Sequence, residues 1–353
     1  MRIALVAPLF ESVPPKLYGG TERIVSYLAE ELVAQGHDVT LFASGDSVTR
    51  ARLEPIVERG LRLNPQCHDT LAYHILMLDR VFDKAAAFDI IHFHIDYLHF
   101  PLSRQTGIPQ VTTLHGRLDL PELVPLYDRF QDMPLVSVSN NQRKPLPQAN
   151  WLTTVYHGLP ADLYALSETP GSYLAFLGRI SPEKRPDRAI GIARRCGIPL
   201  RIAAKVDRVD AAYFKEHIEP LLDDPLVDYI GEIEEREKQA FLGNARALLF
   251  PIDWPEPFGL VVIEAMACGT PTVAYRCGSV PELVDDGVTG YIVSDEEQAV
   301  RAIERIERID RRRCREIFEE RFTAARMARD YVGVYRRLAG ERVQLEMISA
   351  TSR

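Results

Sequence analysis

Two carboxylates in the second half of the chain have types and spacing that suit nucleotide binding. Glu256 and Glu264 lie eight positions apart within residues 255–271. Pro257 and Gly259 mark a loop that leads into a helix, and the first turn of a helix offers free backbone N–H groups to a phosphate. The two carboxylates would then bind different hydroxyl groups of one ligand. For an isolated pair, a helix-dipole partner at Glu256 and an ordinary surface carboxylate at Glu264 are the simpler interpretations.

Two cations follow the first strand expected in the second half. Arg179 and Lys184 lie in the segment Gly178-Arg179-Ile180-Ser181-Pro182-Glu183-Lys184. Transfer of a group from a nucleotide diphosphate leaves negative charge on the departing oxygens, and fixed cations in a low-dielectric site stabilise that charge. The pair predicts such a site, which needs no metal ion. A solvated basic loop is the alternative.

Three features of the first half follow or end expected strands, and the first of them opens the first expected helix. Gly19 and Gly20, in Tyr18-Gly19-Gly20-Thr21, would let the backbone approach a ligand closely, although such a pair is often only a turn. His115 ends a strand, where a lone histidine is commonly structural. Ser139 closes another strand and could hydrogen-bond a sugar or an acceptor.

Four residues near position 95 have the side chains of a metal site but not its spacing. His92 and His94 share one face of a strand that should end there, which leaves Asp96 and His99 in a loop of unknown direction. The sequence therefore predicts no metal ion and no cofactor. His94 or Asp96 could instead line the side of the site that binds an acceptor.

Short apolar segments that alternate with longer amphipathic ones must position these residues. The pattern is typical of α/β proteins with parallel strands and crossover helices, and it occurs twice. We therefore expect two Rossmann-like doubly wound sheets facing across a cleft, with ligands at the carboxyl ends of the strands. The predicted strands are residues 3–8, 38–43, 89–94, 110–115, 135–139, 152–157, 173–178, 200–204, 227–230, 247–251, 272–275 and 290–293. The predicted helices are residues 21–35, 71–87, 185–196, 211–222, 236–244, 259–268, a charged stretch from Glu296 and residues 322–338.

The expected domains are residues 1–165, which bind the acceptor, and residues 166–322, which bind the donor. A linker at residues 160–172 contains Pro160, Pro170 and Gly171. Residues 323–353 form a helix that packs back on the first domain and a tail. The helix has one apolar stripe.

Composition excludes several classes of protein. The 353 residues are 46% hydrophobic and carry a net charge of −8, so a nucleic-acid partner is not expected. The apolar runs are too short to span a bilayer, and the first half has no basic amphipathic stretch, so no stable membrane insertion is expected. Five dispersed cysteines indicate neither a disulfide framework nor a zinc site. A reduced cytoplasm fits this composition.

The stretch at residues 255–271 resembles the Glu-(seven residues)-Glu signature of the retaining glycosyltransferases of family 4, which have the GT-B fold and belong to a glycogen synthase-like superfamily. The resemblance extends through Thr272-Val273-Ala274-Tyr275 to Gly290 and covers nearly the whole chain. It implies that Glu256 holds hydroxyls of the donor sugar and that Glu264 holds the donor ribose.

The resemblance also implies roles for the other candidates. Arg179 and Lys184 resemble the family's diphosphate clamp, Gly19 and Gly20 its glycine loop, and His115 the histidine that lies against the donor sugar. Backbone contacts to the donor are implied for Gly178, Ile233, Phe258, Gly259, Leu260 and Val261.

The implied activity is transfer of a hexosyl group from a nucleotide-diphosphate-sugar to a hydroxyl acceptor, with retention of configuration and without a metal. A UDP-sugar such as UDP-glucose is the favoured donor. A small molecule, a glycan or a glycolipid would serve as acceptor, and the sequence leaves its identity and the oligomeric state open. A nucleotide-sugar epimerase or hydrolase on the same scaffold, or a non-catalytic nucleotide-sugar binding protein, are the alternatives.

Overall fold

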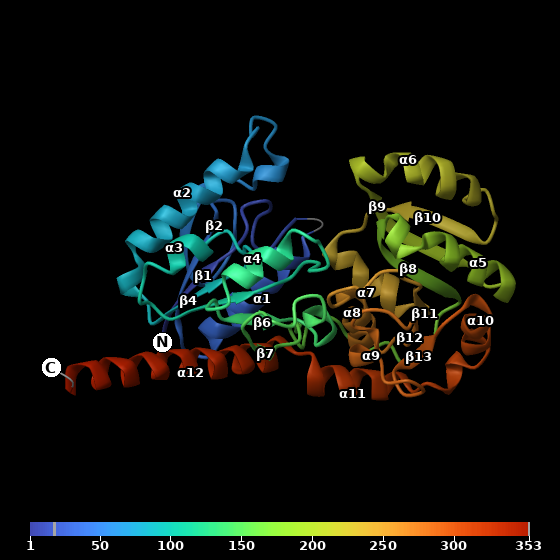
Figure 1. The fold of residues 1–353 in the computed structure, drawn as a ribbon. Helices are drawn as coiled ribbons and strands as arrows, with labels where there is room; N and C mark the ends of the chain where they lie inside the picture. Colours follow the sequence, from blue (N-terminus) through green and yellow to red (C-terminus); the bar gives the residue numbers. More distant parts are fainter. Residues whose placement is uncertain (17–18, 352–353) are drawn as a thin grey trace. The chain divides into compact units, whose positions relative to one another are not determined.

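The computed structural model describes residues 1–16 and 19–351 and divides the chain into two compact units (Figure 1). The first unit comprises residues 1–158 and the chain from Ala324 onward, and the second comprises residues 159–323. The sequence places the boundaries after residues 165 and 322 instead. The predicted linker packs on the second unit, because Ser167 N–H donates to the carbonyl of Cys268 at 3.0 Å and Arg315 Nη1 donates to the carbonyl of Tyr164 at 2.5 Å.

A seven-stranded parallel sheet forms the core of the first unit, in the order β3-β2-β1-β4-β5-β6-β7. Its strands are β1 (Arg2–Val6), β2 (Asp38–Ser44), β3 (Arg52–Val57), β4 (Ile90–Phe93), β5 (Gln110–Thr113), β6 (Leu135–Ser137) and β7 (Trp151–Thr154). Its helices are α1 (Gly20–Ala34), α2 (Thr70–Asp83), α3 (Phe100–Ser103), α4 (Leu123–Arg129) and α12 (Ala324–Thr351), with short 3₁₀ turns η1 (Leu61–Leu63), η2 (Ala85–Ala87) and η3 (Asn141–Arg143).

A six-stranded parallel sheet forms the core of the second unit, in the order β10-β9-β8-β11-β12-β13. Its strands are β8 (Tyr173–Ile180), β9 (Leu200–Val206), β10 (Val227–Gly231), β11 (Ala245–Phe250), β12 (Thr272–Tyr275) and β13 (Gly290–Val293). Its α-helices are α5 (Pro186–Cys196), α6 (Ala211–Tyr213), α7 (Glu235–Gly243), α8 (Leu260–Ala267), α9 (Val280–Leu283), α10 (Glu296–Glu304) and α11 (Arg311–Arg321). Shorter turns are η4 (Pro182–Lys184), η5 (Arg208–Asp210), η6 (Phe214–Ile218), η7 (Glu219–Leu221) and η8 (Ile306–Arg308).

Two parallel α/β sheets therefore confirm the predicted fold class. The prediction missed β3, an edge strand that pairs only with β2 among the described strands. Pro55 interrupts its apolar pattern, and proline is tolerated at an edge because no second neighbour needs its missing N–H. The single helix predicted at residues 211–222 is instead α6, the π-turn η6 and the 3₁₀ turn η7 in succession. Pro220 contributes to this, since it has no N–H for the carbonyl of Glu216.

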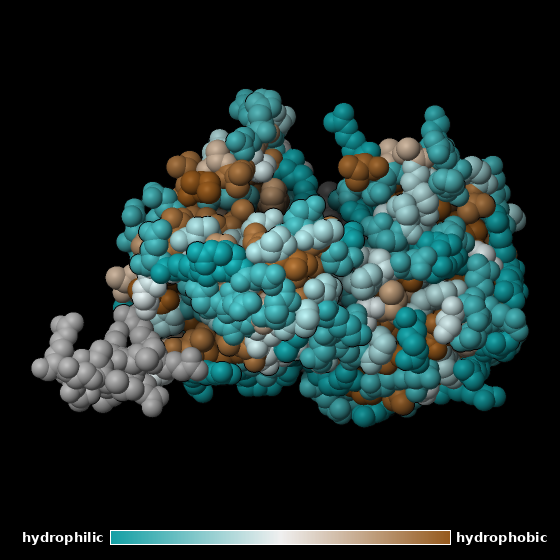
Figure 2. Space-filling view, viewed as in Figure 1, coloured by the Kyte–Doolittle hydropathy of each residue, from teal (hydrophilic) through white to brown (hydrophobic). Residues whose placement is uncertain are grey.

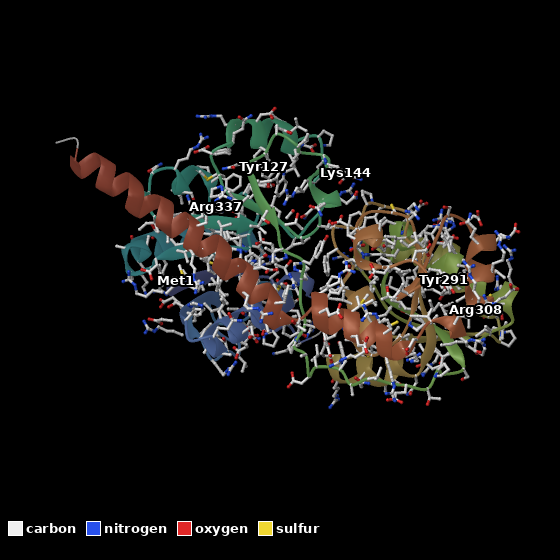
Figure 3. The ribbon with its side chains drawn as sticks, turned by 90° about the horizontal axis from the view of Figure 1, so that it is seen from below. Met1, Tyr127, Lys144, Tyr291, Arg308 and Arg337 are labelled. Carbon is white, nitrogen blue, oxygen red and sulfur yellow. The ribbon has the colours of Figure 1, made fainter. Side chains whose placement is uncertain are left out.

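Helix α12 is anchored in the first unit by buried hydroxyl groups. Tyr335 OH lies 2.7 Å from His92 Nδ1, and Tyr331 OH lies 2.9 Å from Thr113 Oγ1. Figure 3 shows this long helix, with Arg337 marked on it. The contacts join the chain from Ala324 onward to β4 and β5, the two strands that precede His94 and His115.

Apolar side chains of α2 are exposed on the surface of the first unit. Leu71, Ile75 and Leu76 are more than half exposed, and brown residues gather over this helix in Figure 2. Among the helices of the described residues, none is both long and apolar enough to cross a membrane.

Candidate functional site

Arg179 lies near the end of β8 and faces carboxylates. Its guanidinium forms an ion pair with Glu183 and lies 3.4 Å from Asp207 Oδ2 and 3.5 Å from Asp210 Oδ2. Asp207 directly follows β9, which is hydrogen-bonded to β8, and Asp210 is the last residue of the 3₁₀ turn η5 after it. Arg179 is therefore held at the carboxyl edge of the sheet by charge-assisted contacts, and its side chain retains 29% exposure.

Lys184 and Glu256 meet directly, although they are 72 positions apart in the sequence. Lys184 Nζ donates to Glu256 Oε2, and Trp254 Nε1–H donates to the same oxygen at 2.8 Å. The ammonium also lies 5.3 Å from the centre of the Trp254 ring, within the range of a cation–π interaction. The side chains of Lys184 and Glu256 are 18% and 14% exposed. The structure thus brings together two of the predicted residues and adds an indole that the sequence analysis missed.

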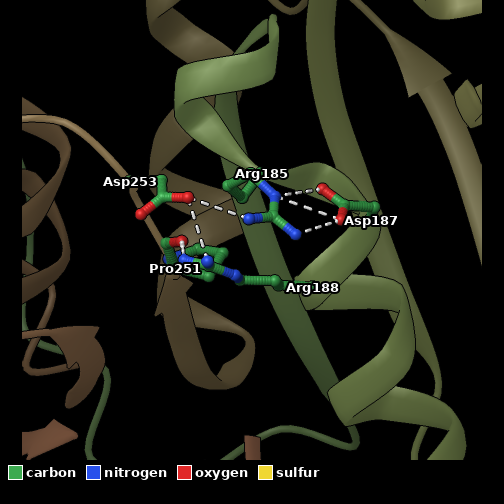
Figure 4. Close-up of polar contacts among 5 residues, drawn as sticks. All are labelled: Arg185, Asp187, Arg188, Pro251 and Asp253. Carbon is green, nitrogen blue, oxygen red and sulfur yellow. Dashed lines mark hydrogen bonds and ion pairs between the residues drawn. The ribbon is translucent and has the colours of Figure 1, made fainter. Parts of the chain in front are cut away.

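Arg185 ties the Lys184 turn to the loop that carries Glu256 (Figure 4). Its Nη1 donates to Asp253 at 2.9 Å, and Arg188 Nη2 donates to the same carboxylate oxygen at 3.0 Å. A backbone bond of 2.8 Å from Asp253 N to the carbonyl of Glu183 completes the link. Arg185 has φ of 53°, a left-handed conformation that costs a non-glycine residue energy. These contacts offset that cost and fix Lys184 against Glu256.

A cavity of about 550 Å³ lies beside this link. It is lined by Pro182, Arg185, Asp187, Tyr213, His217 and Asp253. None of the predicted site residues lines it, and Asp187 and Asp253 already pair with Arg185. The cavity is therefore a neighbour of the candidate site.

Helix α8 begins directly after Gly259, which has φ of 89°. A Cβ at this glycine would lie 3.1 Å from the Phe250 ring, so both conformation and space favour glycine. In the described part of the chain no side chain caps this helix end. The N–H groups of Leu260 and Val261 belong to its first turn, where intrahelical partners do not exist. Phe258, just before it, is buried.

The loop after β12 holds the Glu256 segment in place. Gly278 has φ of 55°, and a Cβ there would lie 2.4 Å from the backbone nitrogen of Glu256. Ser279 N–H donates to the carbonyl of Glu256 at 3.1 Å, and Ser279 Oγ donates to the carbonyl of Phe258. Two backbones thus approach so closely that only a glycine fits between them. Ser279 is a second positioning residue that the sequence analysis did not single out.

Glu264 lies in the second turn of α8 and is only 4% exposed. Its Oε1 accepts a hydrogen bond of 2.8 Å from Lys238 Nζ on α7. The interpretation of Glu264 as an ordinary surface carboxylate is therefore wrong. No contact of its side chain with Glu256 is present among the described residues, so the two glutamates occupy separate places at the start of α8 and in its second turn.

Gly178 and Ile233 lie near the carboxyl ends of β8 and β10 in the same sheet. Gly178 is inside β8, one residue before Arg179, and a Cβ there would meet no described atom within 4 Å. Ile233 follows β10 by two residues and is partly exposed. Both residues are at the carboxyl edge, as their predicted backbone roles require.

In the first unit, His115 is held by neighbouring histidines. β4 and β5 are parallel neighbours, so the residues that follow them meet, and His94 Nδ1 lies 2.9 Å from His115 Nε2. The His157 ring stacks on His115 with 5.2 Å between ring centres. Desolvation lowers the pKa of His115 to about 3, so its imidazole is neutral at pH 7. Nδ1 of His115 is buried and has no hydrogen-bond partner among the described residues.

Two other histidines of this region are engaged by hydroxyl groups through both ring nitrogens. His92 contacts Tyr335 OH and Thr113 Oγ1, each at 2.7 Å. His99 contacts Ser103 Oγ at 2.6 Å and Thr112 Oγ1 at 2.7 Å. Both nitrogens of each ring are therefore committed to structural hydrogen bonds.

Ser139 is fully buried two residues after β6. Its Oγ accepts a hydrogen bond of 3.2 Å from the backbone N–H of Gln142. The Gln142 side chain in turn donates to the carbonyls of Leu114 and Gly116, each at 2.9 Å, on either side of His115. Ser139 thus supports a turn whose glutamine fixes the His115 backbone, and Gln142 is another residue that the sequence analysis missed.

Gly19 and Gly20 lie at the start of α1, and Tyr18 of the same motif lies outside the described residues. A Cβ at Gly19 would lie 2.8 Å from Pro15 Cβ, so the protein's own packing already explains this glycine. The carbonyl of Gly19 accepts the N–H of Arg23 and begins the helix. The structure places the pair at the end of the β1 connection. It brings neither glycine to His115 or Ser139 through any described hydrogen bond.

Comparison with protein families assigns both halves of the chain. Residues 18–170 match the family described as "Glycosyltransferase Family 4", and residues 166–321 match "Glycosyl transferases group 1". The chain belongs to the family 4 glycosyltransferases. The expected resemblance is thereby confirmed, and the matched segment of group 1 glycosyltransferases contains Arg179, Lys184, Glu256 and Glu264.

Several glycosyltransferases resemble the chain over different lengths. D-inositol 3-phosphate glycosyltransferase of Mycobacterium leprae is 36% identical over 149 residues, which are 38% of this chain and 31% of that protein. The match therefore spans less than a third of that relative. Glycogen synthase of Mycobacterium tuberculosis is 26% identical over 343 residues, covering 82% of this chain and 81% of the enzyme.

Among solved structures, HepE of Anabaena in complex with UDP and glucose superposes with a TM-score of 0.73 at 21% identity. The match covers 95% of this chain and 99% of HepE. Together with the two parallel sheets, this likeness shows that the glycosyltransferase has the GT-B fold.

Proposed function

We propose that this protein is a retaining glycosyltransferase that moves a sugar from a UDP-sugar to a hydroxyl acceptor without a metal ion. The observation that carries the proposal is the contact of Lys184 and Glu256, supported by Trp254, next to the start of α8, which no described side chain caps. This part of the second unit has a cation, a carboxylate that can accept hydrogen bonds from sugar hydroxyls, and the backbone N–H groups of a first helical turn. A diphosphate with a sugar attached needs these three kinds of group.

The proposed chemistry assigns charge stabilisation to the side chains. Bond cleavage at the anomeric carbon leaves a second negative charge on the terminal phosphate of the nucleoside diphosphate, and Lys184 and Arg179 stabilise it as it develops. Their positive charges take the part that a metal ion has in other transferases, which is why the proposal includes no metal. Binding of the diphosphate requires Lys184 to share or exchange its present partner Glu256.

A carboxylate nucleophile is not part of the proposal. Glu256 has Lys184 and Trp254 on one oxygen and is assigned to the sugar hydroxyls, and Glu264 is assigned to the ribose. An oxygen of the leaving phosphate takes the proton of the attacking acceptor hydroxyl, which approaches on the same face of the sugar. This route retains the configuration without a covalent sugar–enzyme adduct.

His115 has a proposed role within the first unit. Its neutral imidazole offers the buried Nδ1 to a hydroxyl group of a bound substrate, while Nε2 stays with His94. With a pKa of about 3 it does not exchange a full proton at neutral pH. We assign it a hydrogen-bonding rather than an acid or base role.

The test begins with thermal denaturation in the presence of UDP, GDP and ADP sugars. A donor that binds the folded state raises the melting temperature. The stabilising donor is then incubated with a panel of hydroxyl acceptors in EDTA, and the anomeric configuration of the product is read by proton NMR. The proposal expects a product with retained configuration, formed only with an acceptor.

Other outcomes favour the alternatives. A changed sugar on the same nucleotide without an acceptor would show an epimerase, and free sugar without an acceptor would show a hydrolase. Stabilisation without turnover across the acceptor panel would favour a binding protein. Loss of transfer in EDTA that Mg²⁺ restores would contradict the metal-free part.

A further inference from the structure

Glu264 is a buried carboxylate that is bound through one oxygen only. Lys238 Nζ lies 2.8 Å from Oε1, while Oε2 has no hydrogen-bond partner in the described part of the chain. A carboxylate oxygen with small exposure and no partner is costly unless something binds it. The free oxygen can accept hydrogen bonds from two neighbouring hydroxyl groups of a ligand.

Lys238 is itself fixed by a second carboxylate. It lies 3.1 Å from Oε2 of Glu235, three positions earlier on α7, and its side chain is only 17% exposed. Tyr164 OH donates to the other oxygen of Glu235. The Lys238 ammonium therefore bridges the carboxylates of Glu235 on α7 and Glu264 on α8. Tyr164 in turn holds Glu235.

The start of α7 is ordered independently of this bridge. Glu234 and Glu237 form a capping box, in which the Glu237 side chain accepts the backbone N–H of Glu234 at 2.7 Å. Lys238 is the residue after this box, so its backbone is already placed before the side chain reaches Glu264. A preorganised cation restricts the carboxylate to one rotamer more effectively than a mobile one.

We propose that Lys238 is a positioning residue that holds Oε1 of Glu264, so that Oε2 receives the ribose hydroxyls of a nucleoside diphosphate. The inference rests on the proposed function, because it takes the ligand of Glu264 from there. Lys238 acts through Glu264 and does not touch the ligand. Its removal should therefore weaken only those ligands that have ribose hydroxyl groups.

The test is a calorimetric titration with UDP and with 2′,3′-dideoxy-UDP, which lacks both ribose hydroxyls. The proteins are the wild type, Lys238→Met, Glu264→Gln and the double variant. Lys238→Met should lose about tenfold or more in affinity for UDP, the size of one hydrogen bond to a charged group. Its affinity for dideoxy-UDP should change by no more than about twofold.

The double variant separates an indirect role from direct contact. In the Glu264→Gln background, adding Lys238→Met should change UDP affinity by no more than about twofold, because the carboxylate through which it acts is gone. Equal losses for both ligands, or a further large loss in that background, would overturn the inference. If the wild type binds none of UDP, GDP and ADP, the proposed function fails and this inference fails with it.

Two controls keep the test independent of folding. Lys84→Met makes the same chemical change in the first unit, where Lys84 Nζ pairs with Glu54 at 2.7 Å on the surface, and it should leave both affinities unchanged. Removing one partner of a buried ion pair can unfold a protein. If Lys238→Met does not fold, Lys238→Gln keeps a hydrogen-bond donor without the charge and is tested in the same cycle.

Discussion

Glu256 receives two hydrogen bonds on a single oxygen, from an ammonium and from an indole. The indole of Trp254 fixes the carboxylate, and its ring lies against Lys184, so one residue orients both members of the ion pair. The second carboxylate oxygen is left for the sugar in the proposed complex. This arrangement makes Trp254 the most informative neighbour of the proposed catalytic pair.

Replacing Trp254 with phenylalanine keeps a ring beside Lys184 but removes the N–H that holds Glu256. We expect kcat/KM for the nucleotide-sugar to fall about tenfold, because a hydrogen bond to a charged group is lost. Steady-state kinetics with the donor found by thermal denaturation measure this change.

Trp151→Phe is the matched control. Trp151 Nε1–H also makes one hydrogen bond, of 2.8 Å to the carbonyl of Leu146 in the first unit. Its loss should cost about 1 kcal/mol of stability and leave kcat/KM within about twofold. Equal kinetic losses in the two variants would show that the Trp254 contact has no special part in the reaction.

Individual site residues were predictable where a local pattern marks them, and their partners were not. Glu256, Glu264 and Gly259 belong to one short stretch, so sequence alone indicated a loop followed by a helix. Lys238 gave no signal, because its contact with Glu264 depends on how α7 and α8 pack. Trp254 had a weak signal in its position between Asp253 and Pro255, two residues before the first glutamate.

The loop between β12 and α9 contributes to the site by close packing and by hydrogen bonds to its backbone. Gly278 and Ser279 carry no charge that could bind the proposed donor. They instead fix the backbone of Glu256 and Phe258. The same short connection therefore sets where Glu256 can be. Gly278 and Gly287 allow a direct test of whether the backbone at position 278 must approach that of Glu256 closely.

Gly278→Ala should abolish donor binding or weaken it by at least about tenfold. The added Cβ would lie 2.4 Å from Glu256 N, so the Glu256 loop must move in addition to the backbone strain of a positive φ. Gly287→Ala has the same strain, with φ of 78°, but a Cβ there meets no described atom within 4 Å. It should bind donor normally at a cost of about 1 to 2 kcal/mol in stability. Calorimetry and urea unfolding compare the two, and similar affinities would contradict the argument.

Helix α12 depends on buried polar contacts with β4 and β5. Tyr335→Phe removes the hydroxyl next to His92 Nδ1 and leaves that buried nitrogen without its partner. We expect a loss of about 1 to 3 kcal/mol in the free energy of unfolding, measured with urea. Val332→Ala, a change on the same helix without a polar partner, provides the comparison for lost packing alone. A Tyr335→Phe protein as stable as the wild type would contradict the anchoring role.

Strands and helices with a regular apolar period were predictable, and irregular elements were not. β12 and β13 have the predicted bounds, because both are short apolar runs buried in the sheet. α3 and α4 were missed, since each is short and contains a proline. The packing of α12 on the first unit was predictable from the apolar stripe of the helix. Its hydroxyl contacts with His92 and Thr113 were not, because they form only when the chain returns to the first unit.

The two units differ in their content of histidine. All histidines except His217 belong to the first unit. Burial lowers the pKa of most of them, namely His37, His74, His92, His94, His99, His115 and His157. The folded first unit thus keeps these rings neutral at a pH where the unfolded chain would protonate them.

Acidification should therefore destabilise the first unit. A histidine with lowered pKa contributes its full stability above about pH 6.5 and loses it as the pH falls towards the folded value, about 3 for His115. For His115 the cost is about 1.4 kcal/mol for each pH unit between 6.5 and its folded pKa of about 3. Urea unfolding of the Trp254→Phe protein, followed by Trp151 fluorescence at pH 7.5 and 5.5, measures it. An unchanged midpoint would contradict the buried, neutral state of these rings.

In the proposed function, a diphosphate binds within the second unit, against Lys184 and the start of α8. Calorimetric titration of UDP into the wild type, Lys184→Ala and Lys215→Ala tests this most directly, because Lys215 is an exposed lysine of the same unit. We predict that Lys184→Ala weakens UDP binding by at least about tenfold and that Lys215→Ala binds like the wild type. Undiminished UDP affinity in Lys184→Ala would contradict the proposed donor site.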